Sequence, residues 1–195
     1  MKRFFDIIVS LLGCFLTLPL ILLCIPVIRL GSPGRAVFCQ QRVGLGKKEF
    51  TCYKLRTMKV GTRQVGTHQL SESAVTGIGR FLRSTKLDEI PQLWNVLIGD
   101  MSLVGPRPCL PTQEELIGER EKKGVFSVVP GITGLSQIEG LDMSNPVGLA
   151  SRDADYVESA SFGLDFKILV WTALGKGSGD RVTVENDLND PKEFH

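Results

Sequence analysis

Hydrophobic positions are concentrated at the N-terminal end of this 195-residue chain, and no charged residue occurs from Ile7 to Ile28. As one helix, these 22 residues would be roughly 33 Å long, which is enough to cross a hydrocarbon core of about 30 Å. The pattern therefore predicts that residues 1–30 enter a membrane.

Three kinds of membrane segment compete for this stretch. A cleaved signal peptide is disfavoured because Asp6 interrupts the basic start, no Ala-x-Ala site follows, and the apolar run continues past the lipoprotein-like box at Cys14. A straight transmembrane helix has the right length, but Pro19 lies near its middle and Pro26 follows. Lysines and arginines flank both ends, so the positive-inside rule places both ends in the cytoplasm. A helix that enters, bends at Pro19 and returns would satisfy this rule, and the residues alone leave the straight and the re-entrant helix open.

After this segment the apolar runs become short. The strand-like stretches 36–41 and 50–55, joined by a turn at Gly44–Lys48, predict a β-hairpin. Residues 60–73 are polar and lack periodicity, which predicts a mobile loop. The tail beyond Gly175 is rich in glycine, aspartate and asparagine and is expected to be poorly ordered.

Helical patterns occupy most of the remaining chain. Three helices are predicted from apolar spacing and start signals: one with Ile78, Phe81 and Leu82 on one face, one opening at Pro91 with Leu93, Val96 and Leu97 as its apolar side, and one opening at a Thr112/Glu115 capping box and ending near Lys123. Pro130, Gly131 and Gly134 then interrupt the chain. Residues 164–171 are aromatic-rich and amphipathic, which fits either a packed core helix or a helix in the membrane plane.

Composition adds three constraints. The length allows one domain with a modest core, and a net charge of +2 gives no indication of nucleic-acid binding. Five scattered cysteines and two histidines (His68 and His195) do not form a zinc pattern. Nothing suggests a disulfide framework, so we expect a reducing, cytoplasm-facing body.

The densest group of reactive residue types lies between Arg80 and Arg107. Asp88 and Glu89 have an ordinary explanation, because acidic residues favour the first turn of a helix. Their neighbours Arg83, Lys86 and Arg107 supply cations that hold anionic oxygen atoms, and Asp88 is a suitable ligand for Mg²⁺. Carboxylate, magnesium and arginine together indicate phosphoryl transfer.

Two further observations concern this region. Flanking prolines restrict the backbone at Arg107 and so fix where its guanidinium points. Asp100 is either a second metal or network carboxylate or, more plainly, part of a helix end. The chain has no Walker loop, GxGxxG, G-x-S-x-G or HExxH motif, so the usual signatures of those sites are lacking.

These motifs resemble those of the bacterial monotopic phosphoglycosyl transferases, small enzymes that start membrane-linked glycan assembly. Four blocks carry the resemblance: Lys2 to Asp6 with Leu18-Pro19, Gln41 to Gly44 with Tyr53 to Met58, Thr76 to Pro108, and Pro130 to Gln137. A weaker similarity, Leu164 to Leu169, follows. The match runs in the family's order from about Lys2 to Trp171, and the central block is highly specific.

The resemblance implies an α-rich α+β fold. Residues 1–30 would form a re-entrant membrane anchor broken at Pro19, continuous with a catalytic domain at 31–175, and residues 176–195 would form a flexible tail. Amphipathic interfacial helices and the small hairpin would surround a compact core on the cytoplasmic face of the bacterial inner membrane. With no extra transmembrane domain ahead of the anchor, the chain resembles the minimal catalytic form.

The resemblance also implies a two-step reaction. Asp88 would attack the β-phosphate of a UDP-sugar and release UMP, and polyprenol phosphate, such as undecaprenyl phosphate, would then take the phosphosugar from Asp88. Mg²⁺ would offset phosphate charge, and Glu89 would assist proton transfer or metal placement. Arg107 would bind the phosphate or uridine side, with Lys86 and Arg83 as further cations.

Several points depart from this pattern or stay open. Lys54 and Arg56 would face the phosphates or play a surface or structural role. Leu18 stands where family members often carry serine, so hydroxyl support of the broken helix is expected to be missing. The order Ser84-Thr85-Lys86 shifts the basic residue relative to the commoner motif.

Two other functions compete with the transferase. One is a non-catalytic membrane scaffold of a glycan assembly complex, which would not need the intact Asp88–Glu89 pair. The other is a magnesium-dependent lipid phosphatase or pyrophosphatase. Expected partners are the UDP-sugar, the polyprenol phosphate and membrane lipids, with downstream glycosyltransferases or a second copy of the chain as further candidates and no nucleic acid.

Overall fold

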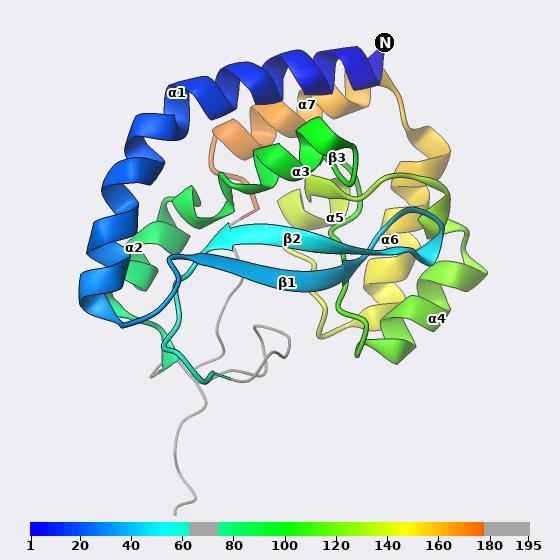
Figure 1. Cartoon of the computed structure of the whole chain (residues 1–195). Helices are drawn as coiled ribbons and strands as arrows, with labels where there is room; N and C mark the ends of the chain where they lie inside the picture. Colours follow the sequence, from blue (N-terminus) through cyan, green and yellow to red (C-terminus); the bar gives the residue numbers. More distant parts are fainter. Residues whose placement is uncertain (63–73, 178–195) are drawn as a thin grey trace, which may run out of the picture.

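The N-terminal helix α1 (Lys2–Gly31) is the longest element of the computed structural model, which describes residues 1–62 and 74–177. It contains Pro19 and Pro26 but stays helical throughout. Figure 1 shows it running along the top of the molecule and then turning down one side. A proline removes one helix hydrogen bond and clashes with the preceding turn, which accounts for a bent rather than a straight helix.

The hydroxyl of Thr17 lies just ahead of the bend and donates to the carbonyl oxygen of Gly13 at 2.7 Å. Pro19 leaves the carbonyl of Phe15, four residues earlier, without its helix N–H donor, so the Thr17 bond to Gly13 does not replace the hydroxyl that Leu18 lacks. The expectation drawn from Leu18 stays a prediction. Within the described chain, α1 is also the one helix long and apolar enough to cross a membrane, judged by length and composition alone.

Both halves of α1 are attached to the body. Near its start, buried Asp6 accepts from the Ser102 hydroxyl at 2.8 Å, and Arg3 donates to the carbonyl groups of Val96 and Leu97 at the end of a neighbouring helix. Near its end, Ile28 is 2% exposed and packs in an apolar cluster of the body. The helix therefore contacts the body at both ends.

The predicted hairpin is present. Strands β1 (Val37–Val43) and β2 (Glu49–Leu55) pair antiparallel, and the turn between them contains Gly46 at φ 60°. The left-handed conformation at Gly46 suits a residue without a Cβ. The amide of Asn95, which is fully buried, donates to Thr51 O at 2.7 Å and accepts from Tyr53 N at 3.1 Å, so the helix that carries Asn95 is joined to β2.

Two short helices and a turn follow the hairpin. They are α2 (Gly77–Ser84), the 3₁₀ turn η4 (Leu87–Glu89) and α3 (Gln92–Ile98). On α2, Leu82 is buried as predicted, but Phe81 is 55% exposed and does not share the core-facing side. Pro91 is the N-cap of α3, one residue ahead of the predicted first turn, and Gly99 ends the helix at φ 100°.

A second sheet was not predicted. Strand β3 (Ser102–Val104) pairs in parallel with β4 (Gly131–Thr133), which is one of the places where the sequence indicated only chain breaks. The remaining elements are helical: α4 (Glu114–Lys122), η5 (Val125–Ser127), α5 (Leu135–Ile138), α6 (Pro146–Ser159) and α7 (Phe162–Ala173).

The start of α4 corrects one prediction. Its N-cap is Gln113 rather than Thr112, and no side chain caps the helix. The Gln113 side chain instead accepts a hydrogen bond from Leu110 N at 2.8 Å. The Thr112/Glu115 capping box is therefore wrong, because Gln113 adopts the cap position and turns its amide back to the preceding loop.

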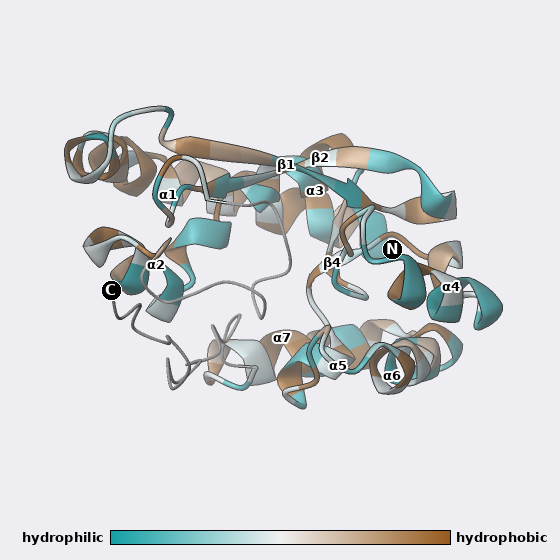
Figure 2. Ribbon diagram, turned by 90° about the horizontal axis from the view of Figure 1, so that it is seen from below, coloured by the Kyte–Doolittle hydropathy of each residue, from teal (hydrophilic) through white to brown (hydrophobic). Residues whose placement is uncertain are grey.

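The elements form two layers around the second sheet. Figure 2 shows the hairpin, α1 and α3 on one side, α5, α6 and α7 on the other, and β4 between them. The largest apolar cluster joins these layers through buried side chains such as Val96, Met101, Val104 and Ile168. The helix-rich fold with a small β component agrees with the predicted fold class. Most of the predicted loop at residues 60–73 and nearly all of the predicted flexible tail lie outside the described residues.

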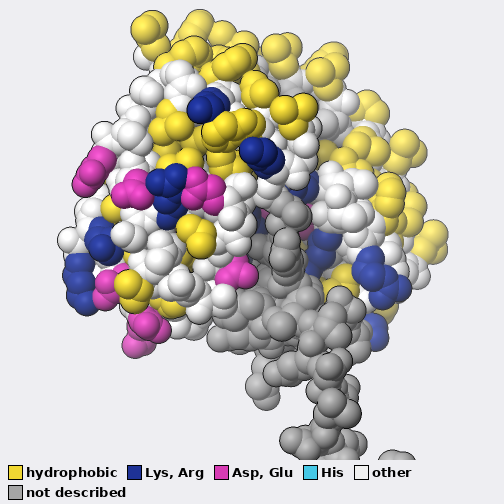
Figure 3. Space-filling model, turned by 180° about the vertical axis from the view of Figure 1, so that it is seen from behind, with side chains coloured by type: hydrophobic (Ala, Val, Ile, Leu, Met, Phe, Trp, Pro, Cys, Tyr) yellow, Lys and Arg dark blue, Asp and Glu magenta, His cyan; other side chains and the backbone are white. Residues whose placement is uncertain are grey.

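Large apolar side chains cover the outer surface of α1. They include Phe4, Leu11, Phe15, Leu16, Leu23 and Leu30, each more than half exposed. Figure 3 shows hydrophobic side chains gathered along the top and one edge of the molecule, where α1 runs. Contiguous exposed apolar surface of this extent is unusual for a water-soluble monomer and is typical of a membrane or protein interface.

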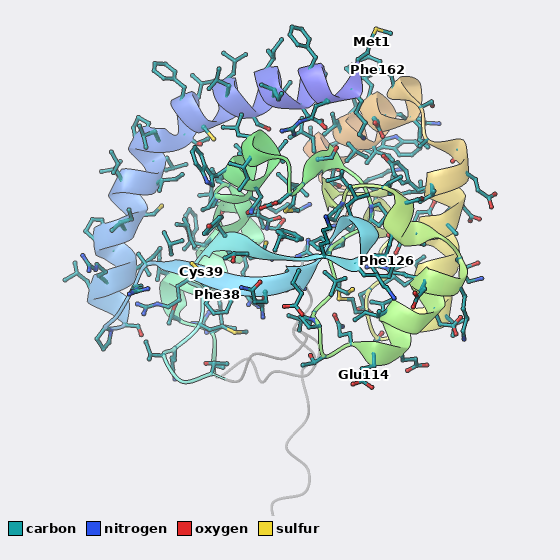
Figure 4. The ribbon with its side chains drawn as sticks, turned by 45° about the vertical axis from the view of Figure 1, so that its right-hand side comes forward. Met1, Phe38, Cys39, Glu114, Phe126 and Phe162 are labelled. Carbon is teal, nitrogen blue, oxygen red and sulfur yellow. The ribbon has the colours of Figure 1, made fainter. Side chains whose placement is uncertain are left out.

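Helix α7 has one buried side and one exposed apolar side. Ile168 is fully buried in the core, whereas Phe162 and Phe166 are 51% and 57% exposed. The ring of Phe162 meets that of Phe5 edge to face, with centroids 5.3 Å apart, and Figure 4 shows Phe162 beside the start of α1. One side of α7 is thus core, and its other side continues the exposed apolar surface of α1.

Candidate active site

The Asp88–Glu89 pair lies in η4, the 3₁₀ turn that leads into α3, rather than in the first turn of α3 itself. Lys86 precedes the turn in the left-handed region at φ 57°. Its carbonyl accepts from Glu89 N at 3.2 Å, which closes the turn. Asp88 is buried, at 8% exposed.

Glu89 is the centre of a charged cluster drawn from three parts of the chain. Its Oε1 accepts from Lys54 Nζ of β2 at 3.1 Å and from Arg107 Nη2 at 2.7 Å. The three side chains are only 14–16% exposed. Residues separated by up to 53 positions therefore meet at one carboxylate, and charge-assisted hydrogen bonds of this kind are directional as well as strong.

Asp88 differs from Glu89 in its electrostatic surroundings. Burial, and then the negative charge of Glu89, raise the pKa of Asp88 from 3.8 to about 6, although Lys54, Arg83 and Arg107 act in the opposite direction. Desolvation penalises the charged form of a carboxyl group, so the ionised Asp88 is held at a cost. A poorly solvated carboxylate near several cations is a candidate for a functional residue.

Arg83 lies within electrostatic reach of Asp88. Its Nε donates to the Thr57 hydroxyl at 2.9 Å, which fixes the guanidinium plane. In the part of the chain that the structure describes, its buried Nη1 has no hydrogen-bond partner. A buried guanidinium nitrogen left in this state is suited to an anionic ligand, because unpaired buried donors are rare.

The other two predicted cations lie elsewhere. Lys86 Nζ donates to the carbonyl of Gly177 at 2.6 Å. Arg56 is 9% exposed, and its guanidinium donates to Ser32 O and Pro33 O just after α1. Of the two alternatives stated for Arg56, this geometry favours the structural one, since it holds the chain where α1 ends.

Two buried charged residues near Arg107 were missed by the sequence analysis. Arg120 of α4 donates to the carbonyl oxygen of Arg107 at 2.8 Å and pairs with Asp153 of α6 at 2.6 Å. A single sequence offered little signal for them, because both occur in charged, helical stretches that are normally solvent-facing.

Comparisons with known proteins bear directly on this site. Residues 1–176 match the model of the family described as bacterial sugar transferase, which covers most of the chain and both residues of the pair. The chain belongs to the bacterial sugar transferase family. The predicted family and the predicted transferase class are thereby confirmed.

Three similar proteins of this family share between 35% and 40% of aligned residues with the chain. The UDP-glucose:undecaprenyl-phosphate glucose-1-phosphate transferase of Caulobacter vibrioides is 40% identical over 180 residues, covering 88% of this chain and 67% of that protein. The undecaprenyl-phosphate galactose phosphotransferase of Salmonella typhimurium is 37% identical over 194 residues, covering 89% and 40%. The UDP-N-acetylgalactosamine-undecaprenyl-phosphate N-acetylgalactosaminephosphotransferase of Aeromonas hydrophila is 35% identical over 181 residues, covering 88% and 42%. The chain thus spans less than half of the latter two proteins, and the three names carry three different sugars.

The carboxylates Asp88 and Glu89 are oxygen donors of the type that Mg²⁺ prefers. Across residues 1–62 and 74–177, no three His, Cys, Asp or Glu side chains gather as an all-protein metal site. Mg²⁺ is usually bound by one or two carboxylates together with substrate phosphates and water. Asp88 and Glu89 supply two adjacent carboxylates, so the donor set fits Mg²⁺ bound to a diphosphate.

Proposed function

We propose that the protein transfers a sugar-1-phosphate from a UDP-sugar to a polyprenol phosphate, with undecaprenyl phosphate as the expected acceptor, and releases UMP. The observation that carries the proposal is the buried Asp88 beside the cluster of Glu89, Lys54 and Arg107. The names of the relatives support the substrate classes, since three of them name an undecaprenyl-phosphate acceptor and two name a UDP-sugar donor.

The reaction proceeds in two displacements on phosphorus. A carboxylate oxygen of Asp88 bonds to the β-phosphorus of the UDP-sugar while the bridging P–O bond to UMP breaks, and UMP leaves with the electron pair. A phosphate oxygen of polyprenol phosphate then bonds to the same phosphorus while the bond to Asp88 breaks. This step regenerates the carboxylate and yields a polyprenyl-diphosphate sugar.

The side chains around Asp88 divide the supporting roles. Arg107 and Lys54 hold Glu89 and bring positive charge to the diphosphate, and Arg83 offers its buried Nη1 to the same charge. Glu89 orients these cations and shares metal placement with Asp88. When bound, Mg²⁺ supplies charge neutralisation of the diphosphate oxygens. Lys86 joins the phosphate site by exchanging its contact with Gly177 for substrate oxygen.

The shape of α1 supports a re-entrant membrane arrangement. Its two ends contact the body while the side chains along its outer surface are apolar, so a re-entrant insertion keeps both ends on one face. A straight crossing would pull one of these ends away from the body. Basic flanks on both sides support an insertion with that face in the cytoplasm. The pair in η4 then works at the inner-membrane surface, where a lipid phosphate is accessible.

UMP formation from a panel of UDP-sugars, measured with and without undecaprenyl phosphate, tests this function. We expect Mg²⁺-dependent UMP with a preferred sugar, and transfer of the phosphosugar to lipid when the acceptor is present. A scaffold would give no UMP with any sugar. A lipid phosphatase would instead release inorganic phosphate from the polyprenyl substrate alone.

Cysteine labelling tests the re-entrant insertion. Cys39 is exposed in β1, just past the end of α1, while Cys52 and Cys109 are buried. A second cysteine placed in a short tag ahead of Met1 reports the other end of the helix. Figure 4 labels Met1 and Cys39. With a membrane-impermeant maleimide, both sites are expected to react in inside-out vesicles and neither in right-side-out vesicles. Cys39→Ser is the control for the native site, and labelling from opposite sides would rule out the re-entrant helix.

A further inference from the structure

The backbone around Arg107 is held through its carbonyl groups. Pro106 and Pro108 have no N–H to donate, so the carbonyl oxygens are the groups by which this segment is fixed. Each carbonyl oxygen from Pro106 to Cys109 accepts a hydrogen bond from its own donor. Gly131 N donates to Pro106 O at 3.0 Å, and Val43 N donates to Cys109 O at 2.9 Å. Between them, Arg120 Nη1 donates to Arg107 O at 2.8 Å and Arg42 Nη1 donates to Pro108 O at 2.9 Å.

The donor to Arg107 itself belongs to a buried ion pair. Arg120 Nε and Nη2 donate to Asp153 Oδ2 at 3.0 and 2.6 Å, and Asp153 Oδ1 accepts from the Ser136 hydroxyl at 2.7 Å. The Arg120 and Asp153 side chains are 2% and 1% exposed. The guanidinium is therefore held in one plane by Asp153, and its remaining arm points at the Arg107 carbonyl.

A contribution to folding stability does not by itself explain why Arg120 and Asp153 form a buried ion pair. Removing two charges from water is costly, and well-packed apolar residues of similar volume are often at least as stabilising as a buried ion pair. What an apolar pair does not provide is a directed donor to the carbonyl of Arg107. The fixed fork of an arginine provides both contacts at once, which a lysine does not.

We propose that Arg120 and Asp153 are positioning residues that set the direction in which the Arg107 guanidinium extends toward Glu89 and the substrate phosphates. This inference rests on the proposed function, in which Arg107 binds the diphosphate. The Arg107 side chain reaches Glu89 at 2.7 Å from a backbone that Arg120 holds at 2.8 Å. A small rotation of that backbone displaces the guanidinium from the reacting phosphate.

The main test replaces the ion pair by an apolar one, Arg120→Met with Asp153→Leu. We expect this double variant to fold, with a melting temperature close to that of the wild type, because removal of the buried charges offsets the loss of their hydrogen bonds. We expect it to form UMP about 100-fold more slowly, because misplacement of a positioned group by about 1 Å has effects of this size. Arg120→Lys keeps the charge balance but loses the fork, and is expected to show a smaller loss of the same kind. The matched control is Arg152→Gln on α6, the helix that also carries Asp153. It breaks the solvent-accessible ion pair between Arg152 and Glu139 and should leave turnover unchanged.

A double-mutant cycle with Arg107→Ala separates positioning from a general structural role. If Arg120 and Asp153 act through Arg107, the apolar pair should cause little further loss once Arg107 is alanine. An equal loss in both backgrounds would overturn the positioning role, as would normal turnover of both the apolar pair and Arg120→Lys. A wild-type protein that forms no UMP would overturn the proposed function and this inference together, whereas an active wild type with a fully active apolar pair would overturn this inference alone.

Discussion

Replacing Asp88 with asparagine is expected to abolish UMP formation and, at pH 7, to make the protein more stable. An amide is isosteric with the carboxylate but cannot form the acyl phosphate, so the first displacement is lost. The pKa of Asp88 is raised from 3.8 to about 6 by burial and by Glu89. At about 1.4 kcal/mol for each pKa unit, ionised Asp88 lowers the free energy of unfolding at neutral pH by on the order of 3 kcal/mol.

The direction of the Asp88 pKa shift determines how its contribution to the free energy of unfolding depends on pH. Because the folded-state pKa is above the unfolded value, the contribution of Asp88 is fully favourable below about pH 4 and is lost as the pH rises through about 6. Denaturant unfolding of wild type and Asp88→Asn should therefore give similar stabilities at pH 4 and a more stable variant at pH 7. Glu158→Gln, on the exposed end of α6, is the control and should change neither stability nor turnover. Full turnover of Asp88→Asn would exclude Asp88 as the nucleophile, and equal stability at both pH values would contradict its costly burial.

The substitution Gly131→Ala is expected to destabilise the fold by more than about 3 kcal/mol, which is at the upper end of single-residue effects. A Cβ at this position would overlap the backbone nitrogen of Gly105 and lie 2.6 Å from its carbonyl oxygen. The atoms it meets are all backbone, so no side chain can rotate away. Since Gly131 N also donates to Pro106 O at 3.0 Å, the overlap would separate β4 from the segment that carries Arg107.

Thermal unfolding compares Gly131→Ala with a matched alanine. Gly118 lies inside α4, and a Cβ there meets nothing within 4 Å. Gly118→Ala is expected to raise the free energy of unfolding by about 0.5–1 kcal/mol, since alanine is the better helix former. If both variants unfolded at the same temperature as the wild type, the close approach of β4 to Gly105 would be incorrect.

Local signals explain which parts of the fold were predictable. The hairpin follows from two strand-like runs around a glycine turn, and the helices at Ile78 and Pro91 follow from periodicity. The second sheet gave no such signal, because β3 and β4 are three residues each and pair across 26 intervening residues. Strands this short show no alternation, and parallel pairing depends on contacts distant in sequence.

The candidate site also combines residues that a local sequence motif predicts with residues that only tertiary contacts bring together. Asp88, Glu89 and Arg107 share one dense motif, whereas Lys54 joins them only because Asn95 fixes α3 to β2. Arg56 is two residues from Lys54 and has the same chemistry, yet it turns to the end of α1. Strand register and helix packing decide between these two cations, and neither is visible as a residue pattern.

The attachment of α1 at both ends has a consequence for engineering this protein. Removing residues 1–31 would not release an intact soluble body, because it would leave Ser102, the carbonyl groups of Val96 and Leu97, and the core around Leu82 without their partners. A water-soluble form would have to keep this helix with its bend and exchange the outward leucines and phenylalanines for polar residues. The helix that we propose to insert in the membrane is therefore also part of the packed structure of the enzyme.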